Sequence, residues 1–444
     1  MGVFQLNIMV EMIFILLHFF VFIGSYHLLN KKISQPAVLF ALVWFLLILG
    51  HLIFKLTLLD EMDTLRVETY FIFLMGNISF TAGSFIINQY YQFKFSQNIP
   101  DTNSPEGVHI KLRLFLSIFL IVALPFYVKT AFDIFIASQS EELFIGIKYE
   151  ISYGEVNFGL YAYLVTFSYV VFAFNLHAYY KEKNHFNLAI LISSLICGTT
   201  YAIFAGGRLQ LFMVFCIYVG VGFFMGKKIS IKKLLWPAFI FLLFFLGAGI
   251  IYRKGGSVDD SFSENLYGSL QNLGIYLVSS LNALDLDMAK HLSPNTDGER
   301  TFRFFIKLAR ETGILPNVKP RNLLQDFVFI PYPTNVYTYY MSYILDFGKI
   351  YAWAMLFIYG IIHTFFYNIA LYKKSLRMIL CYSFFLFPSL LSFFDDFYMT
   401  QFSLWLQLFL YTEMILISDK YFRLLNSKFK DPIHPSYFKQ DDCG

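Results

Sequence analysis

The stretch QPAVLFALVWFLLILGHLIFKLTL, residues 35–58, decides the fold class of this chain. It contains a single lysine and no other formal charge. An apolar run of about 20 residues is long enough to cross the hydrocarbon core of a bilayer as an α-helix. The run follows the basic pair Lys31 and Lys32 and precedes the acidic pair Asp60 and Glu61. It therefore predicts a membrane-spanning helix with one basic and one acidic end.

Similar apolar runs recur along the whole chain. Of the 444 residues, 57% are hydrophobic and 14% are charged, whereas soluble domains carry about 25% charged residues. The sequence therefore predicts an all-α polytopic membrane protein with about eleven transmembrane helices. These helices are expected at residues 6–29, 35–58, 69–93, 112–132, 158–180, 188–205, 209–226, 234–252, 349–371, 378–394 and 402–418.

The charges between the apolar runs predict the orientation. More than half of the 34 Lys and Arg residues lie in alternate linkers and in the tail, and the linkers between those are acidic or neutral. Because basic linkers stay in the cytoplasm, we expect an outside N-terminus and a cytoplasmic tail at 419–444. The same alternation divides the remaining chain into eight helices in 1–252, one large extracytoplasmic loop at 253–348 and three helices in 349–418.

Composition disfavours several classes of function. A formal net charge of +4 does not indicate binding to nucleic acid. The four cysteines show no CxxC or Cys/His spacing, so the sequence predicts neither a metal site nor a disulfide framework. No Lys or Arg precedes the first apolar run, which does not fit a cleaved signal peptide.

Two arginines lie on the side that is otherwise poor in basic residues. Arg208 follows Gly206 and Gly207 in a short outer turn, and Arg253 begins the large loop. A guanidinium at the outer boundary presents a fixed fork of donors that suits a phosphate or diphosphate, and the glycines allow a bulky ligand to approach the backbone. The alternative is that both arginines are interfacial anchors with solvated heads.

Amphipathic helices are expected within the large loop. Apolar residues recur at three- and four-residue steps in 262–290, which predicts one or two helices. A second helix is expected to start near 297–301, with a basic face opposite an apolar one. That basic face would attract either substrate or phospholipid headgroups. Its members are Arg300, Arg303, Lys307 and Arg310.

The end of the large loop offers groups that suit sugar hydroxyls. Asn335 and Thr338 supply an amide and a hydroxyl, Tyr337 supplies a ring for stacking, and Asp346 supplies a carboxylate that can accept a proton. The alternative is structural, with helix capping near Asn335 and a turn carboxylate at Asp346.

Ionisable residues are scarce within the predicted helices. Glu11 and Lys55 are the main cases, and Lys55 is expected to reach the outer boundary with its ammonium group. Ion-coupled transporters place such groups near the midplane, so their scarcity disfavours a pump. Asp395 and Asp396 are expected to form a solvated outer turn, with acid–base chemistry as the alternative.

Three short motifs resemble a known family. They are the Ala-Gly-Gly-Arg turn that ends at Arg208, the pair Tyr252-Arg253 at the start of the large loop, and Thr334–Thr338 followed by Leu345–Gly348. Gly298 and Thr301 match a weaker feature. In these residues the chain resembles the O-antigen polymerase family, the Wzy-type polymerases of oligosaccharide repeat units in bacterial cell envelopes.

The resemblance implies a GT-C-like membrane glycosyltransferase of the bacterial cytoplasmic (inner) membrane. Such an enzyme joins undecaprenyl-diphosphate-linked repeat units into a lipopolysaccharide O-antigen or a capsule-like polysaccharide, without a cofactor or a metal. Arg208 and Arg253 would hold the donor diphosphate, and Asp346 would act as the base. The implied partners are the lipid-linked donor and acceptor glycans, membrane lipids and a chain-length regulator protein.

Two other functions remain open at this point. An O-antigen ligase-like transferase shares the architecture and the donor, but it needs a loop histidine, for which His291 is the candidate. A flippase or other transporter of lipid-linked oligosaccharides would need polar groups around a midplane cavity and short outer loops.

Overall fold

The computed structural model describes residues 2–95, 107–153, 156–205, 208–225, 261–290, 298–318, 327–330 and 332–428. This part of the chain is mostly helical, which confirms the all-α class. The long helices are α1 (Gly2–Leu28), α2 (Pro36–Thr57), α3 (Val67–Phe95), α4 (Ile110–Ala137), α6 (Ala162–Lys181), α7 (His185–Phe204), α8 (Arg208–Met225), α10 (Phe262–Lys290), α13 (Lys349–Lys373), α14 (Leu376–Leu390) and α15 (Phe402–Lys428).

Seven of the described helices are long and apolar enough to cross a membrane. They are α1, α2, α3, α4, α6 with the short 3-10 turn η1 (Gly159–Tyr161) before it, α7 and α13. The apolar helices α8 and α14 are shorter. The multi-pass class is thus confirmed, whereas the count of eleven stays a prediction because the expected helix 234–252 lies outside the described residues. Two helix ends differ by more than four residues, since α4 continues past residue 132 to Ala137 and α15 continues past residue 418 to Lys428.

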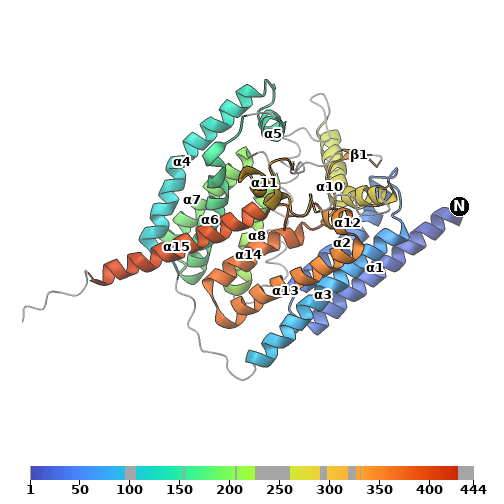
Figure 1. Cartoon of the computed structure of the whole chain (residues 1–444), viewed down its shortest axis with the longest axis horizontal. Helices are drawn as coiled ribbons and strands as arrows, with labels where there is room; N and C mark the ends of the chain where they lie inside the picture. The colour runs from blue at the N-terminus through green and yellow to red at the C-terminus, as the bar shows by residue number, and fades with distance from the viewer. Residues whose placement is uncertain are drawn as a thin grey trace, which may run out of the picture.

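The spanning helices form two groups that meet at α8 and α14 (Figure 1). One group contains α1, α2, α3 and α13, and the other contains α4, α6, α7 and α15. The helix α14 packs on α8, α13 and α2, and α8 also packs on α6 and α7, so these two shorter helices connect the groups. The first turn of α1 and the last turn of α15 lie at opposite ends of the bundle (Figure 1).

Glycines bring the backbones of α3 and α13 into contact. A Cβ added at Gly83 would collide with the carbonyl oxygen of Phe357, and one at Gly360 would collide with that of Phe80. Small residues at such crossings allow close van der Waals packing, which is a main source of helix association where no water is available to be released.

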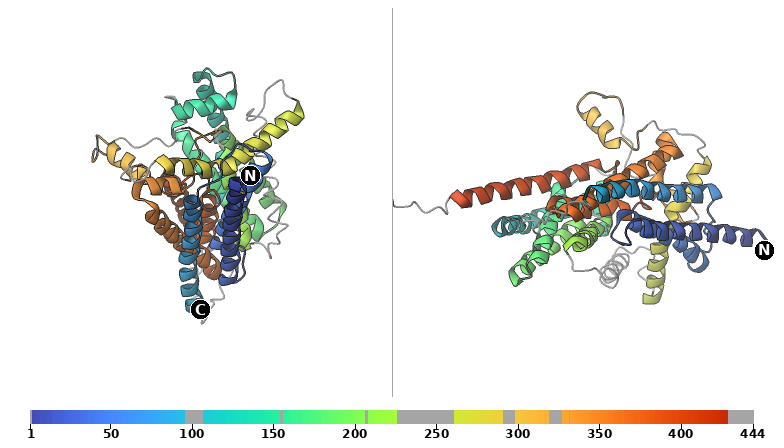
Figure 2. Two further views of the ribbon diagram at one scale, coloured as in Figure 1. Left: turned by 90° about the vertical axis from the view of Figure 1, so that its right-hand side faces the viewer. Right: turned by 90° about the horizontal axis from the view of Figure 1, so that it is seen from below.

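The helix α10 lies across one end of the bundle, which we call the outer end after the orientation predicted from the charged linkers. In the left view of Figure 2 it crosses the tops of the upright helices α1 and α3. Its Gln271 side chain donates to the carbonyl of Leu58 at 3.3 Å, and Asn282 donates to the carbonyl of Asp63 at 2.8 Å. The loop and the acidic linker after α2 therefore share one side, as the charge alternation predicts.

Smaller elements complete the outer end. The helices α5 (Leu143–Tyr153) and α11 (Arg303–Glu311) lie there in Figure 2, and α12 (Tyr340–Phe347) packs on α13. A two-stranded antiparallel sheet joins β1 (Val328–Phe329) to β2 (Pro333–Thr334). The helix α5 was not predicted from sequence. Its segment was expected to be a linker, because acidic residues lie in it and on both sides of it.

The stretch 262–290 is a single helix, one of the two possibilities predicted from sequence. Two other expectations are corrected. The basic helix begins at Arg303, so Arg300 does not share its basic face and is instead 6% exposed in the preceding turn. Lys55 does not reach the water, because its side chain is 8% exposed, with Nζ 3.9 Å from Oε2 of Glu11 and in contact with Thr64.

Candidate functional site

A cluster of polar side chains, most of them buried, occupies the outer end between α12 and α14. The helix α12 contributes Asp346, the linker 391–401 between α14 and α15 contributes Asp395 and Asp396, and the turn before α11 contributes Arg300 and Thr301. We call this group of five residues the carboxylate cluster. Its members come from three segments that are far apart in the sequence.

Asp346 joins α12 to the turn before α11. Its Oδ2 atom accepts a hydrogen bond from the backbone N–H of Thr301 at 2.7 Å, and the residue is 3% exposed. The helix α12 ends directly afterwards at Gly348, whose φ of 89° strongly favours glycine. The carboxylate of Asp346 is therefore held in a fixed position.

Asp396 and Asp395 are not a solvated turn, which corrects the expectation from sequence. Asp396 is fully buried, and Oδ1 accepts the N–H of Tyr398 at 2.9 Å while Oδ2 accepts that of Thr400 at 3.4 Å. Asp395 remains partly exposed and accepts the N–H of Asp396 at 2.7 Å. The carboxylate of Asp396 thus fixes the backbone of the linker, and the side chain of Asp395 is partly accessible to solvent.

Burial changes the acidity of both carboxyls. Desolvation, with the charge of Asp396 as a second cause, raises the pKa of Asp395 from 3.8 to about 7. Desolvation also raises the pKa of Asp396, to about 6, although backbone donors favour its charged form. The positive charge of Arg300 opposes the rise at Asp395, which places the guanidinium near this carboxyl. A carboxyl with a pKa near 7 is suited to accept and release a proton.

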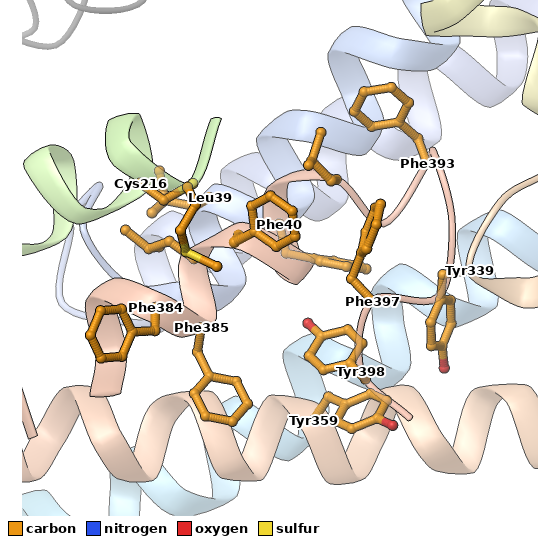
Figure 3. Close-up of a cluster of buried hydrophobic side chains, with 14 of the residues drawn as sticks. Leu39, Phe40, Cys216, Tyr339, Tyr359, Phe384, Phe385, Phe393, Phe397 and Tyr398 are labelled. Carbon is orange, nitrogen blue, oxygen red and sulfur yellow. The ribbon is translucent and has the colours of Figure 1, made fainter. Parts of the chain in front are cut away.

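Aromatic rings line the cluster on the side of α13. The rings of Tyr359 and Tyr398 stack with centroids 3.9 Å apart, and Tyr339 lies beside them (Figure 3). The hydroxyl groups of Tyr343 and Tyr359 are 2.9 Å apart, and Tyr343 also bonds to Asp396. The tyrosines thus surround Asp396 with buried rings and hydroxyl groups.

The linker 391–401 is held rigidly in place. The indole N–H of Trp405 donates to the carbonyls of Phe397 and Tyr398 at 2.9 and 3.0 Å. The carbonyl of Ser392 accepts the N–H of Tyr339 at 2.9 Å, and its hydroxyl accepts the indole N–H of Trp44 at 3.1 Å. Positions fixed in this way suit a site in which geometry matters.

Two buried hydroxyls near the cluster have no hydrogen-bond partner within the described part of the chain. They are Oγ1 of Thr301 and Oγ1 of Thr338, on residues that are 0% and 1% exposed. Thr301 is tied to Asp346 through its own N–H, so its backbone is held beside a carboxylate. A buried hydroxyl without a partner is costly, and a polar ligand would relieve that cost.

The structure brings only some of the predicted site residues together. Thr338 precedes α12 and is buried with Tyr337, whereas Asn335 is partly exposed. These residues follow Thr334, whose hydroxyl accepts a hydrogen bond from Ser279 of α10 at 3.1 Å. Two predicted basic residues, Arg303 and Arg310, lie on α11. Gly207, Arg253, His291 and the side chain of Arg208 lie outside the described residues, although the backbone of α8 begins at Arg208.

The burial of the aspartate pair in the linker was not predicted from sequence. The neighbouring residues are Phe393, Phe394, Phe397 and Tyr398, and such an apolar surrounding is the signal of burial that was available. In the described ranges, no group of three or more His, Cys, Asp or Glu residues is arranged to hold a metal ion.

Comparison with known proteins supports the resemblance seen in the motifs. A stretch of 141 residues is 27% identical to a protein of Escherichia coli (strain K12) whose name is "Putative O-antigen polymerase". The match covers 32% of this chain and 34% of that protein, so it spans about a third of each. No family model matches the chain, and no solved structure does. The resemblance to O-antigen polymerases that the motifs predict is thus confirmed over about a third of the chain.

Proposed function

We propose that this protein polymerises oligosaccharide repeat units carried on undecaprenyl diphosphate, on the outer face of a bacterial cytoplasmic membrane. The product would be a surface polysaccharide such as an O-antigen or a capsule. The observation that carries the proposal is the carboxylate cluster at the outer end of a multi-pass bundle, in a chain that resembles an O-antigen polymerase.

The chemistry requires a base and an electrostatic partner for the leaving group. The acceptor hydroxyl attacks the anomeric carbon of the donor, the bond from that carbon to the diphosphate breaks, and the lipid diphosphate leaves. The acceptor proton passes to a carboxylate, and the guanidinium groups of Arg208 and Arg253 neutralise the charge on the diphosphate. No residue needs to form a covalent intermediate.

Two carboxylates are candidates for the base. Asp346 was predicted for this role from sequence, but it is almost fully buried and bonded to the N–H of Thr301. Asp395 is partly exposed, and its pKa of about 7 is matched to proton transfer at neutral pH. The geometry therefore favours Asp395 as the base and Asp346 as the residue that positions the turn with Arg300.

Acceptor binding involves the segment before α12, which lies against the linker that carries Asp395, since the N–H of Tyr339 donates to the carbonyl of Ser392 at 2.9 Å. The hydroxyl of Thr338 and the amide of Asn335 can bond to sugar hydroxyls. Asn335 and Tyr337 belong to the same segment, and Arg303 and Arg310 on α11 would meet the charged part of the acceptor lipid.

The test is polymerisation by the purified protein in lipid nanodiscs, with one synthetic lipid-linked repeat unit as both donor and acceptor. The wild type is expected to form a ladder of longer glycans on a gel. Asp395→Asn should slow chain growth about 100-fold or more, the scale of general base catalysis. Arg208→Ala should lower the rate by a similar factor, because it removes charge from the leaving group.

The matched control is Glu311→Gln, which neutralises a carboxylate of the same outer region that is 63% exposed on α11. It should leave the ladder unchanged. A wild-type ladder from both Asp395→Asn and Asp346→Asn would contradict the proposed site. Single-unit transfer to a different lipid core, without chain growth, would instead indicate the ligase-like reaction.

One observation favours a transporter of lipid-linked oligosaccharides as the second candidate. Asn77 of α3 and Asn368 of α13 are fully buried, and their amide atoms have no hydrogen-bond partner within the described ranges. Polar groups of this kind inside spanning helices can mark a substrate path. The same helices touch through Gly83 and Gly360, however, which leaves no room for a glycan at that crossing. Accumulation of repeat units on the cytoplasmic side of a deletion strain would support transport.

A further inference from the structure

The helix α11 has an apolar face that the described part of the chain leaves partly uncovered. The side chains of Phe305 and Leu308 on this helix are exposed, although both are large and apolar. In the turn directly after the helix, Leu315 is also exposed, and Ile314 is 74% exposed. Exposed apolar side chains that lie together mark a surface for a membrane or for a partner. This face is therefore expected to be covered by a bilayer or by another protein.

The turn after α11 extends the same apolar face. The N–H of Ile314 donates to the carbonyl of Ala309 at 2.8 Å, and the N–H of Gly313 donates to the carbonyl of Arg310 at 3.1 Å. Gly313 has a φ of 78°, so these two bonds form a Schellman motif. In this motif the residue after the glycine returns to the side of the helix from which its carbonyl acceptor comes. Ile314 therefore lies on the side of Ala309, which is the apolar side of the helix.

The opposite face of α11 is basic. Arg303, Lys307 and Arg310 follow one another at four- and three-residue steps, which places them on one side of the helix. Lys307 and Arg310 are exposed, and Oε1 of Glu311 lies 3.8 Å from Nζ of Lys307. Three basic residues against one acidic residue give the helix a net positive charge. A helix with a basic face opposite an apolar face lies in the interface of a bilayer and is attracted to anionic lipids.

The place of α11 in the fold is also that of an interfacial helix. Figure 2 shows α11 at the side of the bundle, near its outer end. The ring of Phe302, directly before the helix, lies 5.9 Å from that of Phe347 at the end of α12. The ring of Phe305 lies 4.9 Å from that of Phe402 at the start of α15. The helix α13, which follows α12, can span a membrane, and its second residue, Ile350, is 77% exposed. The helix α11 is thus held close to the level at which a spanning helix enters the bilayer.

We infer that α11 docks on an anionic bilayer surface, with its apolar face among the acyl chains and its basic face at the phosphate groups. A bilayer fits better than a protein partner because α11 adjoins the start of a spanning helix, whose exposed side chains lipid covers in any case. The docking goes beyond the proposed function, in which Arg303 and Arg310 meet the acceptor lipid, and it does not depend on polymerisation. Since the turn before α11 carries Arg300 and Thr301, a docked helix also holds that turn in place.

The experiment measures the depth of each face of α11 in the full-length, cysteine-free protein in nanodiscs. Leu308→Cys carries a fluorophore on the apolar face, and Arg310→Cys is the matched control on the basic face; both native side chains are exposed. The nanodiscs contain phosphatidylglycerol and a phospholipid with a spin label high on its acyl chain, which quenches a fluorophore at that depth. Quenching should be about three-fold or more stronger at position 308, because the apolar face of an interfacial helix lies about 5–10 Å into the headgroup and acyl boundary.

A second comparison tests the charge of the lipid. With the label at position 308, replacement of phosphatidylglycerol by phosphatidylcholine should lower the quenching about two-fold or more, because basic residues are attracted to anionic headgroups. Lys307→Gln together with Arg310→Gln should lower it similarly in phosphatidylglycerol. Lys290→Gln is the matched control, since it removes an exposed positive charge at the end of α10 and should leave the quenching unchanged.

Three results would overturn the inference. The first is equal quenching on the two faces in phosphatidylglycerol. The second is quenching that depends neither on the headgroup nor on Lys307 and Arg310. The third is a label at position 308 that escapes the spin-labelled lipid and is also shielded from a water-soluble quencher, which would show that a protein covers this face. Polymerisation is measured separately. A wild type that docks but forms no polymer retains the docking, and one that polymerises with α11 in water retains only the proposed function.

Discussion

The Nδ1 atom of His51 lies 2.6 Å from Oε1 of Glu11, and both side chains are fully buried between α1 and α2. On the other side of the ring, Nε2 lies 2.9 Å from Oδ1 of Asn282 on α10. The amide nitrogen of Asn282 donates to the carbonyl of Asp63, which leaves its oxygen to accept from the ring. The Nε2 atom is therefore a donor, and one further proton is shared between His51 and Glu11. This network attaches α10 to the spanning helices.

Removal of one member of this buried pair is expected to destabilise the protein strongly. Glu11→Leu leaves His51 and Lys55 without their carboxylate, and His51→Leu leaves Glu11 with only the ammonium group of Lys55, 3.9 Å away. Each change should cost about 3 kcal/mol. The double variant Glu11→Leu/His51→Leu removes both groups and should lose less than the sum of the single losses, by about 1 kcal/mol or more. Unfolding followed by tryptophan fluorescence in detergent measures all four proteins. Additive losses would show that the pair has no coupling.

Stability should fall as the pH rises through the acidic range. Burial raises the pKa of Asp395 from 3.8 to about 7, so the folded protein binds a proton there that the unfolded chain releases. The stabilisation is complete below about pH 3.8 and is lost by about pH 7, with a slope of up to about 1.4 kcal/mol per pH unit. The thermal midpoint measured between pH 4 and 8 should show this decline. Asp395→Asn should make the decline smaller and leave the part due to Asp396, whose pKa is raised to about 6. An identical decline in the variant would contradict the assignment.

Polymerisation should show the opposite dependence on pH. If Asp395 is the base, only its ionised form accepts the acceptor proton, and the rate of chain growth should rise with a midpoint near pH 7. Initial rates at saturating lipid-linked repeat unit between pH 5.5 and 8.5 provide the measurement. A rate that does not change across this range would exclude Asp395 as the base.

The crossing of α3 and α13 should not tolerate a methyl group. Gly83→Ala places a Cβ against the carbonyl oxygen of Phe357, and backbone cannot move aside as a side chain can. We expect a loss of about 2 kcal/mol or more, as for overpacked sites. Gly24→Ala is the matched control, because nothing lies within 4 Å of a Cβ added there on α1. Equal thermal midpoints for the two variants would indicate that the helices do not meet as described.

The two ends of the bundle should differ in their access to an impermeant thiol reagent. Glu61 lies in the acidic linker beside α10, and Lys373 ends α13 at the opposite, basic turn; both side chains are exposed. In a cysteine-free background, Glu61→Cys should react in intact cells, and Lys373→Cys should react only after permeabilisation. The reverse pattern would place the carboxylate cluster in the cytoplasm and would contradict the proposed polymerisation on the outer face.

Much of the helical framework could be predicted because hydrophobicity and charge are local properties. The run 35–58 becomes α2 at Pro36–Thr57, and the run 349–371 becomes α13 at Lys349–Lys373. A membrane requires about 20 apolar residues and satisfied backbone groups in each span, so a linear pattern is enough to find the helices. The alternation of basic linkers likewise predicts the side shared by the large loop and the linker after α2.

The site depended on tertiary structure because its members meet through long-range packing. The apolar neighbours of Asp396 in the sequence indicate burial, but they do not identify its partners, which are the tyrosines of α12 and α13 and the indole of Trp405 that enclose its linker. Arg300 has the spacing of a helical basic face, but the turn before α11 directs it inward instead. The sequence by itself determined which segments cross the membrane and which polar residues were available. Only the fold decided which of them are desolvated together, because burial and electrostatic coupling depend on neighbours from distant parts of the chain.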